Sequence, residues 1–226
     1  MAENIGLRGY RVQDPARAEA RRREIMLAMA EVILEKGYAA ATLEDVAARM
    51  GTSRAVIYYQ FRSKDDIYVD ICVEAVANAA TRLEAIVARE DPADATLYAV
   101  LRDLIEVGME PLNHSTLVTG RPRSLPDEGR ERIRGLDRRY TRGIVAILRA
   151  GIDSGTFIER DPRFLAYTLI YSINGNFVWR RPDGPVSTEY VLEELPRMLV
   201  NSVLAHPCDY HAHDGAPPRL SLDPQA

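Results

Sequence analysis

The sequence has little of what stabilises small secreted proteins or spans a membrane. It has two cysteines in 226 residues, Cys72 in a helical pattern and Cys208 in a polar segment near the end, so a disulfide framework is not indicated. The first residues show no apolar stretch of the signal-peptide kind. The longest uncharged run, residues 164–179, is about four residues shorter than a bilayer span. These absences predict a cytoplasmic protein without a membrane partner.

Signatures of enzymes are also absent. The chain contains no G-x-S-x-G, H-E-x-x-H, P-loop or G-x-G-x-x-G motif, so we expect neither enzymatic activity nor a cofactor. One stretch, HPCDYHAHD at residues 206–214, has the residue types that bind zinc or nickel. It belongs to a polar, proline-containing segment, residues 207–226, that we expect to be disordered. We therefore predict no metal site.

Charge is distributed unevenly along the chain. The whole chain has a net charge of −4, whereas residues 1–66 are net positive by one and residues 1–23 contain six arginines against three acids. This excess is compatible with a polyanion partner for the N-terminal end, and equally with a solvated arm. We assign residues 1–14 to a flexible arginine-containing arm.

Helical periodicity runs through almost all of the chain, and no segment has the pattern of a strand. The predicted class is therefore all-α. Residues 113–126, rich in Ser, Thr, Gly and Pro, are predicted to be a loop, and Pro196 is predicted to kink or break the last helix. The predicted helices cover about residues 15–36, 42–50, 53–60, 63–88, 94–111, 127–153, 162–180 and 188–205.

Two short helices joined by a glycine-containing turn, within residues 42–60, predict a helix-turn-helix in a domain of residues 15–66. If Ile57 and Phe61 form the buried edge of the second helix, Ala55 and Tyr59 point away from it. A small residue lets a backbone approach base edges, and a tyrosine offers a ring to a thymine methyl or a hydroxyl to a phosphate. This face is therefore suited to the major groove of DNA.

Two cations add to this interpretation. Arg54 lies in the first turn of the short helix, where base-reading side chains are usual, and guanine is its natural partner. Lys64 lies in the first turn of the next helix, where the helix dipole disfavours a cation. A phosphate at that point would explain it, and so would a solvated surface lysine.

The stretch TLEDVAARMGTSRAVIYYQFRSKDDI resembles the DNA-binding region of TetR-family transcriptional regulators. The shared pattern is Thr-apolar, apolar-Ala, Gly-apolar-Ser, Tyr-Tyr-x-Phe and Ser-Lys-acid-acid-apolar, over about residues 16–70. The sequence departs from it at Ala55, where Gly is commonest, at Gln60, where His is usual, and at Arg62, where Lys or Pro is frequent. The resemblance implies base contacts from Arg54, Ala55 and Tyr58, and phosphate contacts from Thr42, Thr52, Ser53, Tyr59, Gln60 and Lys64.

The resemblance also implies that residues 67–206 form a helical domain that dimerises through its last two helices and binds a small molecule. The predicted helix of residues 162–180 is apolar on nearly all sides, which a four-helix interface would explain, as would burial within one chain. The dimer candidates on this helix are Phe164, Tyr167, Phe177 and Trp179. The candidates for the effector pocket are Met109, Leu117, Tyr140, Tyr171 and Asn174.

The segment FVWRRPDGPVSTEYV resembles one found in a subset of the family, several members of which respond to acyl-CoA or other lipid-derived ligands. The resulting hypothesis is a homodimeric repressor that binds a palindromic operator and is released by a small apolar effector. Three alternatives stay open: a drug-like effector, an architectural DNA-binding protein without a ligand, and a helical enzyme or carrier that has lost the DNA role.

Overall fold

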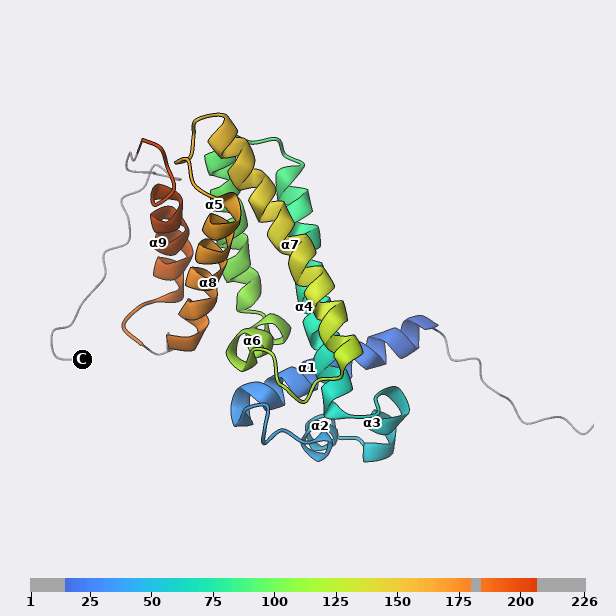
Figure 1. The fold of residues 1–226 in the computed structure, drawn as a ribbon. Helices are drawn as coiled ribbons and strands as arrows, with labels where there is room; N and C mark the ends of the chain where they lie inside the picture. The colour runs from blue at the N-terminus through green and yellow to red at the C-terminus, as the bar shows by residue number, and fades with distance from the viewer. Residues whose placement is uncertain (1–14, 180–183, 207–226) are drawn as a thin grey trace, which may run out of the picture.

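The computed structural model describes residues 15–179 and 184–206, and all its regular elements in these ranges are helices (Figure 1). Within them, an isolated bridge between Phe157 and Leu204 is the only extended pairing. The all-α prediction is confirmed. The predicted arm, the predicted tail and the metal-type cluster after His206 lie outside the described residues. The helices are α1 (Pro15–Lys36), α2 (Leu43–Arg49), α3 (Arg54–Gln60), α4 (Lys64–Val87), α5 (Ala93–Gly108), α6 (Pro111–Thr119), α7 (Asp127–Asp153), α8 (Pro162–Trp179) and α9 (Thr188–Asn201).

Helices α1 to α3 form one end of the molecule, around a core that α4 completes (Figure 1). The apolar stripe of α1 supplies Ile25, Met29 and Ile33, all nearly inaccessible to solvent. Ile57 of α3 and Ile67 of α4 close the same core. This burial holds two helices of seven residues each, which would not be stable alone.

Helix α6 corrects the prediction of a loop at residues 113–126. Pro111 occupies the first turn of α6, where its missing N–H costs nothing. The Ser115 and Thr116 hydroxyls each donate to a carbonyl one turn back, at 2.8 Å, so these polar residues can be buried. Helix α6 packs against α1 and α4, and this tertiary burial outweighs its weak helical propensity.

Helix α4 links the two ends of the molecule, and α7 runs beside it (Figure 1). Tyr68, Ile71 and Cys72 lie beyond the predicted domain boundary at residue 66, yet they belong to the first core. Leu83 and Ile86, near the other end of α4, belong to a second core that α5, α7, α8 and α9 share. A movement of α4 would therefore be felt in both cores.

Helix α9 runs through Pro196 without a break, contrary to the alternative of an interrupted helix. The chain after α9 returns to the end of α7, where the Ile158 N–H donates to the Val203 carbonyl at 2.9 Å. None of the helices in the described ranges combines the length and the apolar character that crossing a bilayer requires.

Candidate nucleic-acid interface

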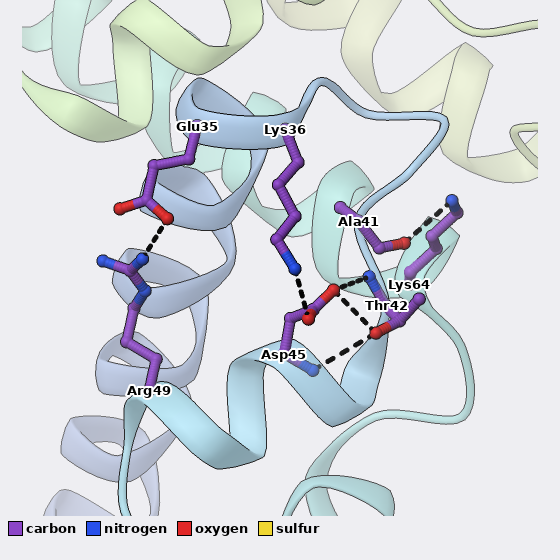
Figure 2. Close-up of polar contacts among 7 residues, drawn as sticks. All are labelled: Glu35, Lys36, Ala41, Thr42, Asp45, Arg49 and Lys64. Atoms are coloured by element: carbon purple, nitrogen blue, oxygen red, sulfur yellow. Dashed lines mark hydrogen bonds and ion pairs between the residues drawn. The ribbon is translucent and has the colours of Figure 1, made fainter.

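Helix α2 begins with a capping box that positions Thr42 at the surface. The Thr42 hydroxyl accepts from the Asp45 N–H at 3.2 Å, and the Thr42 N–H donates to the Asp45 carboxylate at 3.1 Å. Lys36, at the end of α1, donates to the same carboxylate at 2.6 Å (Figure 2). The hydrogen bonds from Lys36 and Thr42 lower the pKa of the Asp45 carboxyl below its ordinary value. The exposed start of α2 is thus held against α1.

The turn between α2 and α3 depends on Gly51. Its φ of 58° lies in the left-handed region that favours glycine. The Thr52 N–H donates to the Ala47 carbonyl at 2.9 Å, which closes the turn. Beyond it, Ile57 and Phe61 are buried, as the sequence predicts for the inner edge of α3. The helix-turn-helix is therefore anchored from inside.

The outer face of α3 carries the side chains predicted to meet DNA. Tyr59 is 70% exposed and Tyr58 is 48% exposed, and Ala55 and Arg54 are exposed beside them. A tyrosine exposed to this degree on a helix anchored by Ile57 gains little from folding alone. The four residues form one outward surface with rings, hydroxyls and a guanidinium.

Arg54 is already oriented in the absence of DNA. Its guanidinium forms an ion pair with Glu44 of α2 at 2.5 Å and donates to the Tyr58 hydroxyl at 3.1 Å. The Tyr58 contact and the charge of Glu44 raise the pKa of Arg54. Because exposed ion pairs contribute little, a base edge or a phosphate could replace Glu44 at small cost.

The Lys64 ammonium is engaged within the protein, and its predicted contact with a phosphate stays a prediction. Its Nζ donates to the carbonyls of Tyr38, Ala39 and Ala41 at 2.9, 3.1 and 3.1 Å (the Ala41 bond is drawn in Figure 2). An ammonium has three N–H groups, and all three are occupied. Lys64 instead fixes the loop that leads to Thr42.

The predicted phosphate ligands Thr52, Ser53 and Gln60 are in or next to α3, and they differ in exposure. Ser53 is exposed and its hydroxyl makes no capping hydrogen bond, while Thr52 and Gln60 are half-buried. The Gln60 main-chain carbonyl accepts from Arg22 of α1 at 2.9 Å. Of this group, Ser53 has the freest polar side chain.

Three arginines of the N-terminal excess are engaged within the protein. Arg22 stacks on the Phe61 ring at 4.0 Å and donates to Asp70 of α4 at 2.9 Å. Arg21 and Arg23 pair with carboxylates of α1 and α4. The sequence showed the charge but not these partners, because Asp70 is 48 residues from Arg22. Arg8 and Arg11 lie outside the described residues.

Helix α8 has two apolar faces, one buried and one exposed. Phe164 and Tyr167 are exposed, as expected for dimer candidates. Tyr171, a predicted pocket residue, lies on the same exposed face at 69% exposure. Phe177, a predicted dimer residue, is buried, with only 6% of its surface exposed. Its ring packs on Gly108 of α5, where a side chain in place of the glycine hydrogen would collide with the ring. The exposure of Tyr171 favours the dimer face and the burial of Phe177 favours the interior, while both assignments stay predictions. The Trp179 side chain is outside the described part.

The remaining effector candidates lie at the edge of the second core or on its helices. Met109, Leu117 and Tyr140 are half-buried and pack against that core. Burial raises the pKa of Tyr140 above its ordinary value. Asn174 has a buried amide oxygen without a hydrogen-bond partner. Met109 caps the end of α5, and Leu117, Tyr140 and Asn174 lie on α6, α7 and α8.

Asn176 is a polar residue that the sequence did not single out. It is 1% exposed, and neither its amide oxygen nor its amide nitrogen has a hydrogen-bond partner. Since buried polar groups are almost always satisfied, such an amide requires a water or a ligand. The sequence signal that could have identified Asn176 is an asparagine within an otherwise apolar helix. Asn174 shows the same signal.

Together, the anchored helix-turn-helix and the second helical domain define a DNA-binding transcription regulator. Residues 25–71 match the family model described as bacterial regulatory proteins of the tetR family, and residues 90–203, half of the chain, match a tetracyclin repressor-like C-terminal domain. The chain belongs to the TetR family of transcriptional regulators.

Several proteins are similar over most of their length. A TetR/AcrR-family regulator from Thermobifida fusca is 30% identical, with a TM-score of 0.65 over 80% of this chain and 97% of that one. The transcriptional repressor KstR2 of Mycolicibacterium smegmatis is 22% identical over 88% of this chain and 98% of its own. FadR of Bacillus subtilis, solved with stearoyl-CoA, is 24% identical, with a TM-score of 0.66 over 79% and 97%. The transcriptional activator FasR of Mycolicibacterium smegmatis is 35% identical over only 60 residues, which are 26% of this chain and 27% of FasR.

Proposed function

We propose that this protein is a homodimeric transcriptional repressor that binds a palindromic operator and is released by a small apolar effector. The proposal of operator binding rests on the outer face of α3, where Tyr59 is 70% exposed on a helix anchored by Ile57. Such a regulator acts where the operator is, in the cytoplasm.

The contacts with DNA divide into two kinds. Arg54, Ala55 and Tyr58 would face base edges, because they occupy the first turns of the exposed helix. Tyr59, Ser53 and Gln60 would contact phosphates. The Thr42 end of α2 would add main-chain N–H groups, and Lys64 would support it from behind through the loop carbonyls.

The dimer would form through α8 and α9. Phe164, Tyr167, Tyr171 and Val178 recur on one side of α8 and are all exposed, and Met198 of α9 is 61% exposed. A continuous apolar face of this kind is typical of an interaction surface. Pairing two copies by a twofold axis would present two α3 helices to successive major grooves, about 34 Å apart.

The effector would occupy the interior of the second core. Met109, Leu117 and Tyr140 would contact its apolar part, and the Asn176 amide would bind a polar group of the ligand. A thioester or amide carbonyl could accept from the Asn176 amide nitrogen, which is the chemistry of an acyl-CoA. The related FadR of Bacillus subtilis, solved with stearoyl-CoA, is an example of this class of ligand in the same fold.

The signal would travel along α4, which both cores share. At its N-terminal end, Asp65 accepts from the Tyr38 hydroxyl, and the Ser124 hydroxyl before α7 donates to Asp65 at 3.2 Å. The Tyr68 hydroxyl donates to the Gly120 carbonyl, beyond α6, at 2.9 Å. Ligand that moves α6 or α7 would thereby shift α4 and separate the two recognition helices.

The test is selection of an operator from a random DNA library with the full-length protein, followed by binding isotherms of variants. Arg54→Ala should weaken operator binding by about 1–3 kcal/mol and relax preference at one base pair in each half-site. Arg89→Ala, an exposed arginine at the far end of α4, is the control. Equal binding by wild type and Arg54→Ala would remove the assignment of α3 as the reading helix.

A further inference from the structure

A groove with a volume of about 730 Å³ runs along the outer side of α7 and the start of α8. The α7 residues that line it recur at helical spacing, so they form one stripe. Its floor consists of the small apolar side chains Val145, Ala146 and Ala150. Its charged or hydroxyl-bearing residues include Arg138, Arg142, Arg149, Asp153, Arg163 and Tyr167.

Three of the four arginines have no carboxylate partner among the residues that the structure describes. Arg138 pairs with Glu131 at 2.8 Å. Arg142 donates only to the main-chain carbonyl of Arg138, at 3.2 Å. No hydrogen bond or ion pair of the Arg149 or Arg163 side chain is found in the described ranges. Most of the other arginines in the described ranges are ion-paired, among them Arg22, Arg82 and Arg139, whereas Asp153 is the one carboxylate among the described residues that line this groove.

Arg149 and Arg163 come from different helices and line the same groove. Asp161 accepts hydrogen bonds from the main-chain N–H groups of Arg163 and Phe164, at 2.7 and 3.0 Å. Those bonds lower the pKa of Asp161, and the charges of Arg163 and Arg149 add to the effect. Arg149 of α7 and Arg163 of α8 both line the groove, together with the carboxylate of Asp153.

The position of the groove argues against a role in binding operator DNA. Arg142 and Arg149 lie in the half of α7 away from α3 (Figure 1). Their separation of seven positions corresponds to about 10 Å along the helix, with apolar residues in between. The arrangement offers a pair of guanidinium groups at one end, an apolar floor, and a third guanidinium that could stack on a flat ring.

We propose that this groove binds a phosphate-bearing small molecule of the nucleotide type. Arg149 and Arg163 bind its phosphates, and the base lies on the apolar floor beside Arg142. The same chemistry occurs in a free nucleotide and in the nucleotide end of coenzyme A. The proposal does not depend on the DNA role or on the effector pocket, since none of the groove residues belongs to either. One lining residue, Tyr167, also belongs to the proposed dimer face of α8.

Isothermal titration calorimetry of the full-length protein with ADP, coenzyme A, pyrophosphate and adenosine tests this. ADP should bind once per chain, pyrophosphate more weakly, and adenosine not detectably. Coenzyme A binding in the groove as well would identify the nucleotide end as the shared element. Arg149→Gln/Arg163→Gln should weaken ADP binding by about tenfold or more, because two charge-assisted contacts are lost.

The matched control is Arg17→Gln/Arg89→Gln, which removes the same charge at two exposed positions outside the groove. It should change ADP affinity by less than about twofold. Equal losses in both double variants would show diffuse attraction and overturn the proposal. So would a lack of ADP binding at millimolar concentration. A change of molecular mass in light scattering for Arg149→Gln/Arg163→Gln, with ADP affinity retained, would mark the groove as a protein contact and also overturn it.

Discussion

Helices α3 and α8 both expose aromatic side chains, but their surroundings differ. On α3, Tyr58 and Tyr59 lie beside Arg54, which Glu44 and Tyr58 orient. On α8, Phe164 and Tyr171 form an apolar stripe. Aromatic rings among oriented charges are suited to DNA, whereas a stripe without charges is suited to a second protein surface. Exposure alone would not separate these two roles.

The largest effect that this comparison predicts concerns α8. Phe164→Glu/Tyr171→Glu should convert a dimer into folded monomers, since charges would be buried at the interface, weakening association by more than about a thousandfold. Light scattering measures the mass and circular dichroism the helix content. Ala85→Glu/Ala88→Glu, at exposed positions in the last turn and the C-cap of α4, is the control for added charge. Unchanged dimers would place the interface elsewhere.

Phe61 and Tyr59 make a matched pair of aromatic residues two positions apart. Phe61→Ala should lower the free energy of unfolding by about 3–5 kcal/mol, because its ring is buried under Arg22. Tyr59→Ala should change it by less than about 0.5 kcal/mol and weaken operator binding instead. Urea denaturation and operator isotherms separate the two. Similar unfolding energies for both variants would contradict the assignment of inner and outer faces.

Replacing Asn176 should stabilise the protein, whereas replacing an ordinary core residue destabilises it. Asn176→Leu should raise the unfolding free energy of the ligand-free protein by about 1–3 kcal/mol, because it removes a buried amide without partners. The same variant should lose its response to acyl-CoA in operator release. Thermal unfolding and release assays measure the two effects. A destabilised variant would mean that the amide is satisfied in the free protein.

The smallest predicted effect is that of replacing Lys64. The variant distinguishes a lysine that supports the loop before α2 from one that contacts a phosphate directly. Lys64→Met keeps the length of the side chain and removes its three donors, so unfolding free energy should fall by about 1 kcal/mol. Operator binding should weaken without a change in its salt dependence. If the slope of log K against log salt fell by about one, Lys64 would be neutralising a phosphate directly.

The region from α1 to α4 could be predicted well because its signals are local. Thr42 and Ser63 cap the helices that follow them, and Gly37 and Gly51 end helices with positive φ, as the sequence indicated. Ile57 and Phe61 are buried as predicted, since a short amphipathic helix has one apolar edge. The partners of Lys64 could not be predicted, because its three carbonyl acceptors are set by the path of a loop 23 to 26 residues earlier.

The larger domain was less predictable for a related reason. Helix α8 is apolar on both faces, so periodicity did not distinguish Tyr171 from Phe177. Helix α6 was missed because its Ser and Thr residues have low helical propensity, and only packing against α1 and α4 compensates for it. Asn176 and the unpaired arginines of the groove become conspicuous only when their neighbours are known.

By itself, the sequence determined the helical class, the order and approximate bounds of most helices, and the position of a DNA-binding motif, because caps, glycines and apolar spacing act within a few residues. Tertiary structure alone decided which face of α8 is buried, that Lys64 and Arg22 are engaged, and that α7 and α8 place unpaired guanidinium groups together. Those features depend on contacts between residues far apart in the chain, whose geometry no local pattern encodes.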